Sequence, residues 1–326
     1  MTDRIFLYIF LSTLLIPFFS YAEHNIKDRR QESSFGIEEW FTSGEAGWQI
    51  SFPYSDLDSG GNGSGIIESE LRFRHINGPV TIAHISSTLN PAWKIDASIG
   101  FGSISRGRGS DTDRDYPAAG GVIVFSESTQ DISGDITRYT LDFSYRKIYS
   151  DNTQSPWGII FGFLHYEDSL VITNGVQTIS EPGWWWSPYS NPPLGPFPDL
   201  YSTYDFSWNA LKIGASYHHK LGGSTYLTGS FSAYPLVHYQ GEGYWNLRDM
   251  TFKHKATTGF GYESALGLRY LITDTTELSA GYRYFHLKAE NGTDTTYFSG
   301  VYGGIANLDF AEVTRLGTYI GFLFRF

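Results

Sequence analysis

Leu211-Lys212-Ile213-Gly214-Ala215-Ser216-Tyr217-His218 (LKIGASYH) alternates apolar residues with polar or small ones at every step. Side chains on a β-strand point to opposite faces in turn, so this period of two predicts a strand with one apolar and one polar face. The same pattern recurs at residues 227–233 and 278–284. The sequence therefore predicts an all-β chain whose strands each have one apolar side.

The connections between the predicted strands are of two kinds. Short ones contain turn-forming residues and lie at 90–91, 150–152, 221–224 and 273–276. Long polar ones lie at 53–67, 107–133, 174–204, 241–252 and 290–311. Short and long connections alternate, as in outer-membrane barrels, which place tight turns on the periplasmic side and long loops outside. We expect five long extracellular loops.

The stretches between these connections give ten strands. They are 36–52, 69–88, 93–106, 134–149, 157–173, 205–220, 224–240, 253–272, 276–289 and 312–326. An even number suits a closed antiparallel barrel, and closure removes the exposed edges of an open sheet. The predicted fold is a ten-stranded antiparallel transmembrane β-barrel.

The C-terminal segment places Ile320, Phe322, Phe324 and Phe326 on one face of the last strand. A final strand that ends in Phe resembles the signal recognised by the barrel-assembly machinery, which we therefore expect as a partner through Phe326. A soluble β-sandwich is the alternative fold. It would also account for the 17% aromatic content, which in a barrel forms girdles at the two membrane interfaces.

The N-terminal 22 residues have the pattern of a secretory signal peptide. Arg4 precedes an apolar run from Ile5 to Phe19, and the small residues Ser20 and Ala22 follow it. The apolar run is shorter than the roughly 20 residues that span a bilayer. We expect cleavage after residue 22, a single barrel domain over 23–326, and location in the outer membrane of a Gram-negative bacterium, among its lipids and lipopolysaccharide.

The composition argues against nucleic-acid binding and excludes disulfide bonds. The chain has a net charge of −11, and nucleic-acid binding requires a basic face, so nucleic acid is not an expected partner. The absence of cysteine means that no disulfide contributes to stability. The sequence shows no motif for a cofactor, and no zinc-binding spacing stands out.

An acidic stretch, Gly109 to Pro117 (GSDTDRDYP), is the first candidate site. Oxygen ligands at alternate positions resemble the start of an EF-hand, which also needs Gly at the sixth position and Glu at the twelfth. Those positions hold Tyr116 and Val122. An EF-hand is excluded, while a weaker calcium site and a solvated turn remain alternatives.

The residues around this stretch provide a family resemblance. The turn LNPAW (89–93), the strand KIDASIGFGSIS (94–105) and then Asp113-Arg114-Asp115-Tyr116 resemble the omptins, which are ten-stranded outer-membrane proteases. The resemblance implies that Asp113 and Asp115 correspond to the omptin aspartate pair. In omptins that pair faces an Asp-Glu-His triplet across an extracellular groove, and the Asp and His of the triplet activate the attacking water.

The second half of the omptin site is not matched. Gly241-Glu242-Gly243 stands where Asp-Glu-His is expected, so the general base is missing. A one-residue β-bulge could turn His238 and Glu242 toward the groove as a substitute. The lipopolysaccharide-binding Tyr-x-Glu-x-Arg of omptins is also unmatched, since Phe163, His165 and Glu167 occupy those positions.

Two further groups of residues have alternative interpretations. The segment 181–201 contains Trp184, Trp185, Trp186 and Tyr189. They form a platform for peptides, glycans or a host surface, or else the tryptophans fold inward as a lid over the barrel mouth or touch the outer leaflet. Glu263, Arg269 and Arg283 are expected to pair inside the lumen, with a selectivity filter as the alternative.

Three functions remain open at this stage. The first is a surface protein that has lost proteolysis and binds an extracellular ligand through its loops. The second is an active, divergent omptin-type endopeptidase that uses Asp113 and Asp115. The third is a small porin.

Overall fold

The structure, a computed structural model, describes residues 33–55, 64–117, 120–148, 154–181 and 193–326. It is all-β apart from one turn of 3-10 helix. The elements are β1 (Ser33–Ser55), β2 (Ser64–Asn90), β3 (Trp93–Pro117), β4 (Ile123–Ile148), β5 (Gln154–Ser180), β6 (Gly195–Pro196), β7 (Tyr201–Gly222), β8 (Thr225–Trp245), η2 (Asn246–Arg248), β9 (Met250–Ala256), β10 (Thr258–Leu271), β11 (Thr276–Phe298) and β12 (Val301–Arg325). The predicted signal peptide lies outside the described residues.

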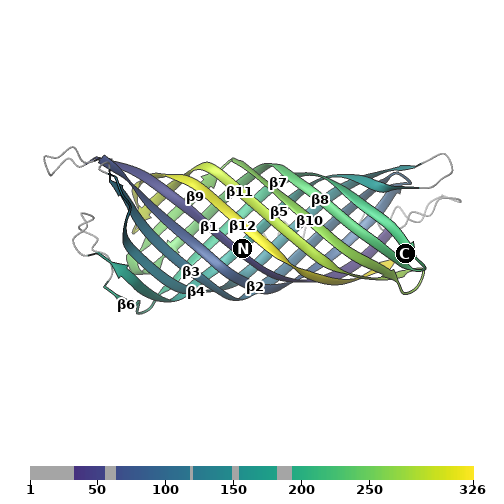
Figure 1. The fold of residues 1–326 in the computed structure, drawn as a ribbon, viewed down its shortest axis with the longest axis horizontal. Helices are drawn as coiled ribbons and strands as arrows, with labels where there is room; N and C mark the ends of the chain where they lie inside the picture. Colours follow the sequence, from purple (N-terminus) through teal and green to yellow (C-terminus); the bar gives the residue numbers. More distant parts are fainter. Residues whose placement is uncertain (1–32, 56–63, 118–119, 149–153, 182–192) are drawn as a thin grey trace. The chain divides into compact units, whose positions relative to one another are not determined.

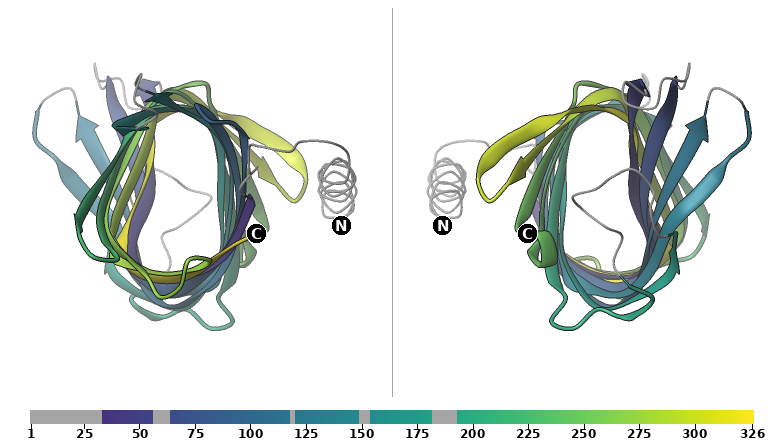
Figure 2. Two further views of the ribbon diagram at one scale, coloured as in Figure 1. Left: turned by 90° about the vertical axis from the view of Figure 1, so that its right-hand side faces the viewer. Right: turned by 90° about the vertical axis from the view of Figure 1, so that its left-hand side faces the viewer.

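The long strands form one ring in which every pairing is antiparallel (Figures 1 and 2). β1 pairs with β2 on one side and with β12 on the other. β9 and β10 follow each other between β8 and β11, interrupted only at Thr257, and together they act as one strand of the ring. With β6 set aside as a two-residue addition to β5, the ring has ten strands, as predicted.

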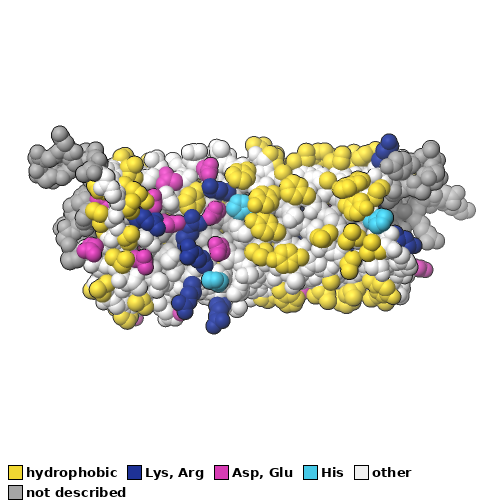
Figure 3. Space-filling model, viewed as in Figure 1, with side chains coloured by type: hydrophobic (Ala, Val, Ile, Leu, Met, Phe, Trp, Pro, Cys, Tyr) yellow, Lys and Arg dark blue, Asp and Glu magenta, His cyan; other side chains and the backbone are white. Residues whose placement is uncertain are grey.

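The outer wall carries an apolar belt over part of its length (Figure 3). Its exposed side chains include Phe41, Phe101, Phe161, Leu211, Phe231, Leu266, Tyr282 and Phe322. The alternation that predicted these strands is confirmed, because Leu211, Ile213 and Phe322 all point outward. Charged side chains gather beyond one edge of the belt (Figure 3). An apolar belt bordered by charged residues is the outer surface that a hydrocarbon layer requires.

No helix in the described ranges has both the length and the apolarity needed to cross a membrane.

The interior of the ring is filled by side chains. At the level of the belt it is polar, with Arg138 2.7 Å from Glu263 and Lys212 2.7 Å from Asp142. The predicted lumen pairing is confirmed in part, since Glu263 lies 3.5 Å from Arg283, whereas Arg269 pairs with Glu277 instead. Beyond the belt the interior is aromatic and contains the buried rings of Trp48, Phe73, Tyr204, Phe206, Trp208 and Phe252.

The strands extend well into segments that the sequence assigned to long polar connections. β3 continues to Pro117 and β4 begins at Ile123, so most of 107–133 is strand. The prediction of a long loop there was wrong. Beyond the belt the outer face of each strand meets water, so the apolar alternation fades while the backbone pairing continues. The acidic stretch therefore lies on a paired strand.

Candidate functional site

The outer half of β3 presents a row of three carboxylates to the interior. Inward-facing positions alternate along the strand, and Asp111, Asp113 and Asp115 fall on that face, below the connection to β4. Between them, Arg114 points outward and forms ion pairs of 2.7 Å with Glu68 and 2.8 Å with Glu70. The alternation therefore separates one outward arginine from three inward acids.

Asp113 is held between two serines. Its cross-strand neighbours are Ser69 on β2 and Ser126 on β4, and both hydroxyls donate hydrogen bonds to its carboxylate. Burial nevertheless raises the pKa of Asp113 above its ordinary value. The pKa of Asp111 is raised further, first by burial and then by the charge of Asp113. Asp115 is almost completely buried.

Asp111 was not among the predicted site residues, which were Asp113 and Asp115. It shares the inner face of β3 with them, and its pKa responds to the charge of Asp113. The signal that could have identified it is the spacing itself, since three acids at alternate positions lie on one face of any extended strand. The acidic group of the site is thus a row of three.

The opposite part of the ring is formed by β8, four strands away from β3. A register shift against β7 lies beside Pro235 and Leu236, and both of these residues face outward. Before the shift Ser232 and Tyr234 are buried, and after it the buried positions are odd-numbered. A shift of one residue exchanges the two faces of a strand.

This shift determines where the predicted substitute base lies. His238 and Glu242 point to the outer wall, where His238 is 2.9 Å from Gln240 and Glu242 is 3.2 Å from Lys253. The register from Leu236 to Tyr244 has no further bulge that would turn them inward. The hypothesis of a bulge that brings both residues into the groove is therefore contradicted, because the observed bulge lies earlier and has the opposite effect.

Gly241 and Gly243 do face inward, and rings from β7, β9 and β8 itself occupy the space beside them. A Cβ atom on Gly241 would lie 2.5 Å from the hydroxyl of Tyr204 and 2.9 Å from that of Tyr239. A Cβ atom on Gly243 would overlap the ring of Phe252. The glycines leave room for these aromatic rings, and a larger residue would require the rings to move.

A buried histidine and aspartate lie beside this glycine. His254 on β9 is the cross-strand neighbour of Gly241, and its Nε2 atom is 3.2 Å from Asp294 of β11. The Nδ1 atom of His254 lies 2.8 Å from the hydroxyl of Tyr204. Trp48 packs edge-on against the imidazole with ring centroids 4.7 Å apart.

Sequence reasoning missed this pair because His254 and Asp294 are 40 positions apart and lie in polar stretches. The arrangement resembles a proton-transfer chain, but both side chains are at most 2% exposed. A general base has to reach the water that it activates. The pair is enclosed by Trp48, Tyr204 and Phe252, so it serves as an internal polar contact.

Arg248, in the 3-10 turn that follows β8, is a cation close enough to act on the acidic row. Its charge acts on both Asp111 and Asp113 and lowers their pKa values, against the larger effect of burial. A guanidinium group donates hydrogen bonds and cannot accept a proton at physiological pH. Arg248 therefore adds positive charge near the acids and cannot itself act as a general base.

The remaining sequence-predicted features are a metal site, the aromatic segment and the residues of β5. In the described part of the chain no group of three or more His, Asp or Glu side chains is spaced to hold a metal ion. The aromatic segment with Trp184, Trp185, Trp186 and Tyr189 lies outside the described residues. Phe163, His165 and Glu167 point to the outer wall of β5, with His165 2.9 Å from Asn209.

Comparison with known proteins gives a family and a fold. Residues 42–314 match the family model described as Pom, Protochlamydia outer membrane protein. The outer membrane protease OmpT from Escherichia coli is similar in structure, with a TM-score of 0.71 and 15% identity over 93% of this chain and 99% of OmpT. The translocator domain of the autotransporter NalP from Neisseria meningitidis aligns over 99% of this chain and 98% of its own length, with 11% identity and a TM-score of 0.39. No curated protein matches.

These findings confirm an outer-membrane β-barrel with the omptin type of fold. They also confirm the predicted location in the outer membrane. At 15% identity the likeness to the protease concerns the fold alone.

Proposed function

This chain belongs to the Protochlamydia outer membrane protein family, and we propose that it is a non-proteolytic surface protein that binds a cationic extracellular ligand at the mouth of its barrel. It is an omptin-like barrel that lacks the Asp and His half of the protease site. The ligand class follows from the acidic row on β3, which consists of Asp111, Asp113 and Asp115. A basic peptide is the occupant whose charge fits.

One observation carries the loss of proteolysis. Gly241 and Gly243 stand where an omptin places its catalytic Asp and His, and Tyr204, Tyr239 and Phe252 occupy the space beside them. A general base typically contributes about 10²- to 10⁴-fold to a rate, and without one the water near the acids is a poor nucleophile. The lost side chains and the ring packing support the same conclusion independently.

Ligand binding is supported by the electrostatics of the mouth. Burial raises the pKa values of Asp111 and Asp113, and the charge of Asp113 raises that of Asp111 further, so an added cation would stabilise their ionised forms. A lysine or arginine of a ligand would supply this positive charge and form charge-assisted hydrogen bonds. Arg248 supplies part of it now, and we expect the ligand to compete with Arg248.

The test is a binding titration with the purified barrel in micelles. The probe is a fluorescent peptide with two adjacent arginines, compared with the same peptide carrying glutamines instead. We expect Asp111→Asn with Asp113→Asn to weaken binding of the arginine peptide about tenfold or more, since charged pairs that are partly buried reach this size. Glu242→Gln with Glu290→Gln removes two outer-wall charges and is the matched control.

Two results would contradict this proposal. One is equal binding of the arginine and glutamine peptides to the wild-type barrel. The other is an unchanged affinity in the Asp111→Asn, Asp113→Asn variant when the control variant is also unchanged.

A second candidate function, a narrow channel, is favoured by one observation. A polar cavity of about 190 Å³ lies in the belt region of the lumen and is lined by Asp96, Arg138, Asp142 and Lys212, among others. The buried aromatic rings beyond the belt argue against an open path. Planar-bilayer recordings distinguish a channel from a surface protein. A steady ionic conductance supports the channel, and the lack of any conductance supports the surface-protein proposal.

A further inference from the structure

The pairing of β12 with β1 stops before the extracellular end of either strand. The last cross-strand neighbours are Ser51 and Asn307. Residues 301–306 continue β12 beyond that point and, in the described part of the chain, pair only with β11. We call residues 301–306 the β12 edge. Since no described strand lies on its outer side, the backbone N–H and C=O groups there are open to an added strand.

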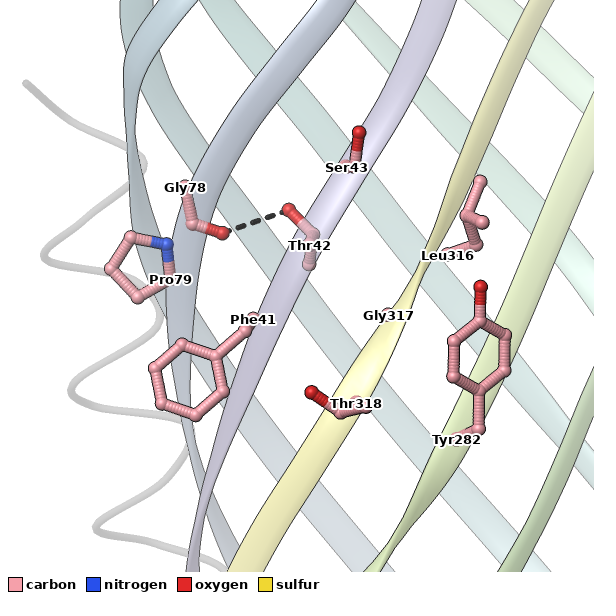
Figure 4. Close-up of a pocket in the computed structure, with 9 residues that line it drawn as sticks. All are labelled: Phe41, Thr42, Ser43, Gly78, Pro79, Tyr282, Leu316, Gly317 and Thr318. Carbon is pink, nitrogen blue, oxygen red and sulfur yellow. Dashed lines mark hydrogen bonds between the residues drawn. The ribbon is translucent and has the colours of Figure 1, made fainter.

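The separation of the two strands is confined to the mouth of the barrel. Figure 2 shows the end of the β11–β12 hairpin, in yellow, leaning away from the ring. Lower on the same strands Phe41 pairs with Thr318 and Thr42 pairs with Gly317, side by side in Figure 4. A hollow of about 440 Å³ at that level is lined by residues of both strands, which stay paired there. The β12 edge is therefore a local feature of the mouth.

The β12 edge lacks two features that usually protect an exposed strand. Its sequence, VYGGIA, has no charged residue and no proline. The register shift at Thr296/Tyr297 bends the hairpin, but no described residue covers the edge. A Cβ atom on Gly304 would meet no atom within 4 Å, so the space beside the strand is open.

Two other strands near the mouth show the usual protection. β5 leaves β7 after Thr173, and the short strand β6 covers it at Val176 and Gln177. β1 beyond Ser51 carries Pro53, which has no N–H group to offer an added strand. Of these three edges within the described ranges, the β12 edge alone has neither a cover nor a proline.

The β12 edge also exposes apolar side chains to water. Val301, Tyr302 and Ile305 are each more than half exposed. The ion pair of Arg72 with Glu312 lies on the outer wall between them and the apolar belt, so the lipid that covers the belt does not cover them. Exposed apolar residues gathered on one segment are typical of an interaction surface.

The acid at the base of this edge lacks a cation. Asp309 accepts hydrogen bonds from Ser51 over 2.8 Å and from Gln49 over 3.3 Å, and both donors are neutral. Among the residues that the structure describes, no lysine, arginine or histidine forms an ion pair with Asp309. Positions 290–292 of β11, which lie opposite 308–310, contain no basic residue. A basic side chain of an added strand would supply the counter-charge.

We propose that the β12 edge binds an extended, basic segment of another polypeptide by strand addition. The segment pairs its backbone with residues 301–306, and its apolar side chains cover Val301, Tyr302 and Ile305. A lysine or arginine of the segment pairs with Asp309. Main-chain hydrogen bonds provide the affinity in this mode of binding, and alternate side chains provide the specificity. An edge of this length corresponds to about 20 Å of extended chain.

A second copy of this chain is a poorer occupant of the edge. Two identical edges would bring two Asp309 carboxylates to one interface, and each chain carries a net charge of −11. The edge is also separate from the acidic row, which lies on the inner face of β3, with β1 and β2 between β3 and β12. Strand addition therefore does not rest on the proposed cation binding by Asp111 and Asp113.

The first test measures peptide binding to the purified barrel in micelles by fluorescence anisotropy. The probe is an eight-residue peptide of alternating threonine and valine with a lysine at each end. Its control has the same side chains but carries N-methyl groups on the backbone nitrogens of its central residues, which removes the donors that strand pairing needs. We expect the N-methylated peptide to bind about tenfold more weakly or worse. Equal binding of the two peptides would overturn the proposal.

A pair of matched variants tests the apolar contacts. Tyr302→Ser with Ile305→Ser removes exposed apolar side chains from the edge. Leu194→Ser with Tyr201→Ser removes similarly exposed side chains elsewhere at the mouth. We expect the edge variant to bind the peptide about tenfold more weakly and the control variant to keep the wild-type affinity. An equal effect in both variants would overturn the proposal.

The charge contact has its own variant. Asp309→Asn should weaken binding of the lysine peptide about two- to fivefold, the range for a partly exposed ion pair. Glu242→Gln, which removes one charge from the outer wall of β8, should change nothing. Unchanged affinity in Asp309→Asn would overturn the basic character of the segment.

Hydrogen exchange with and without the peptide identifies the strand that the peptide covers. We expect added protection at residues 301–306, both in the wild-type barrel and in Asp111→Asn with Asp113→Asn. Protection at 107–117 alone would assign the peptide to the acidic row, which overturns strand addition and leaves the proposed function standing. A dimeric barrel whose 301–306 amides are protected without peptide would assign the edge to a second copy and would also overturn the proposal.

Discussion

The ionised carboxylate of Asp111 lowers the stability of the folded barrel. Burial and the charge of Asp113 raise its pKa well above the ordinary value of 3.8. The folded protein therefore binds this proton more tightly than the unfolded chain does, and stability rises as the pH falls from neutral through the raised pKa. The site keeps a destabilising carboxylate, which is typical of groups retained for binding.

The prediction for this residue is that Asp111→Asn stabilises the barrel at pH 7. Thermal unfolding in micelles should shift upward by roughly 2 to 4 °C, which corresponds to about 1 kcal/mol in a chain of this size. The difference should shrink as the pH is lowered toward 4, where the wild-type carboxyl is protonated. Glu242→Gln on the outer wall should change little at either pH. An Asp111→Asn barrel that is less stable at pH 7 would contradict the pKa direction.

Gly243, unlike Asp111, contributes to the stability of the fold, because its lack of a side chain leaves room for a neighbouring ring. A Cβ atom there would overlap the ring of Phe252. We predict that Gly243→Ala destabilises the barrel by about 1 to 3 kcal/mol through overpacking. In a Phe252→Ala background the same substitution should cost much less, and a double-mutant cycle of unfolding free energies measures the difference. An equal cost in both backgrounds would mean that the ring is not the obstacle.

At the scale of elements, one bulge in β8 determines which of its side chains face the interior. The shift beside Pro235 and Leu236 turns Tyr239, Gly241 and Gly243 inward and leaves His238 and Glu242 outside. The sequence could identify β8 as a strand, because alternation is local. It could not determine which face is inside beyond the bulge, because that depends on the register with β7.

Cysteine labelling tests this orientation directly, since the chain has no cysteine of its own. We predict that His238→Cys and Glu242→Cys react rapidly with a charged maleimide in the folded barrel. Tyr239 is buried, so the cysteine of Tyr239→Cys should react only after unfolding. Fast labelling at Tyr239→Cys together with protection at His238→Cys would place the opposite face inside.

At the scale of the whole molecule, the membrane-spanning part was predictable and the extracellular part was less so. Ten strands, the apolar outer face and the outward Phe322 all follow from a period of two that lipid imposes. The continuation of β3 through Asp113 was missed because no lipid contacts that stretch. The pairing of His254 with Asp294 was missed because contacts between distant strands leave no local pattern.

We propose that the barrel carries an acidic half-site without a general base and does not cleave peptides. The most direct measurement is the cleavage of dibasic peptides by the purified barrel supplemented with lipopolysaccharide, from pH 5 to 8, with the Asp113→Asn variant prepared in parallel. We predict that the peptides remain intact with both proteins at every pH. Cleavage by the wild-type barrel that Asp113→Asn abolishes would contradict the account.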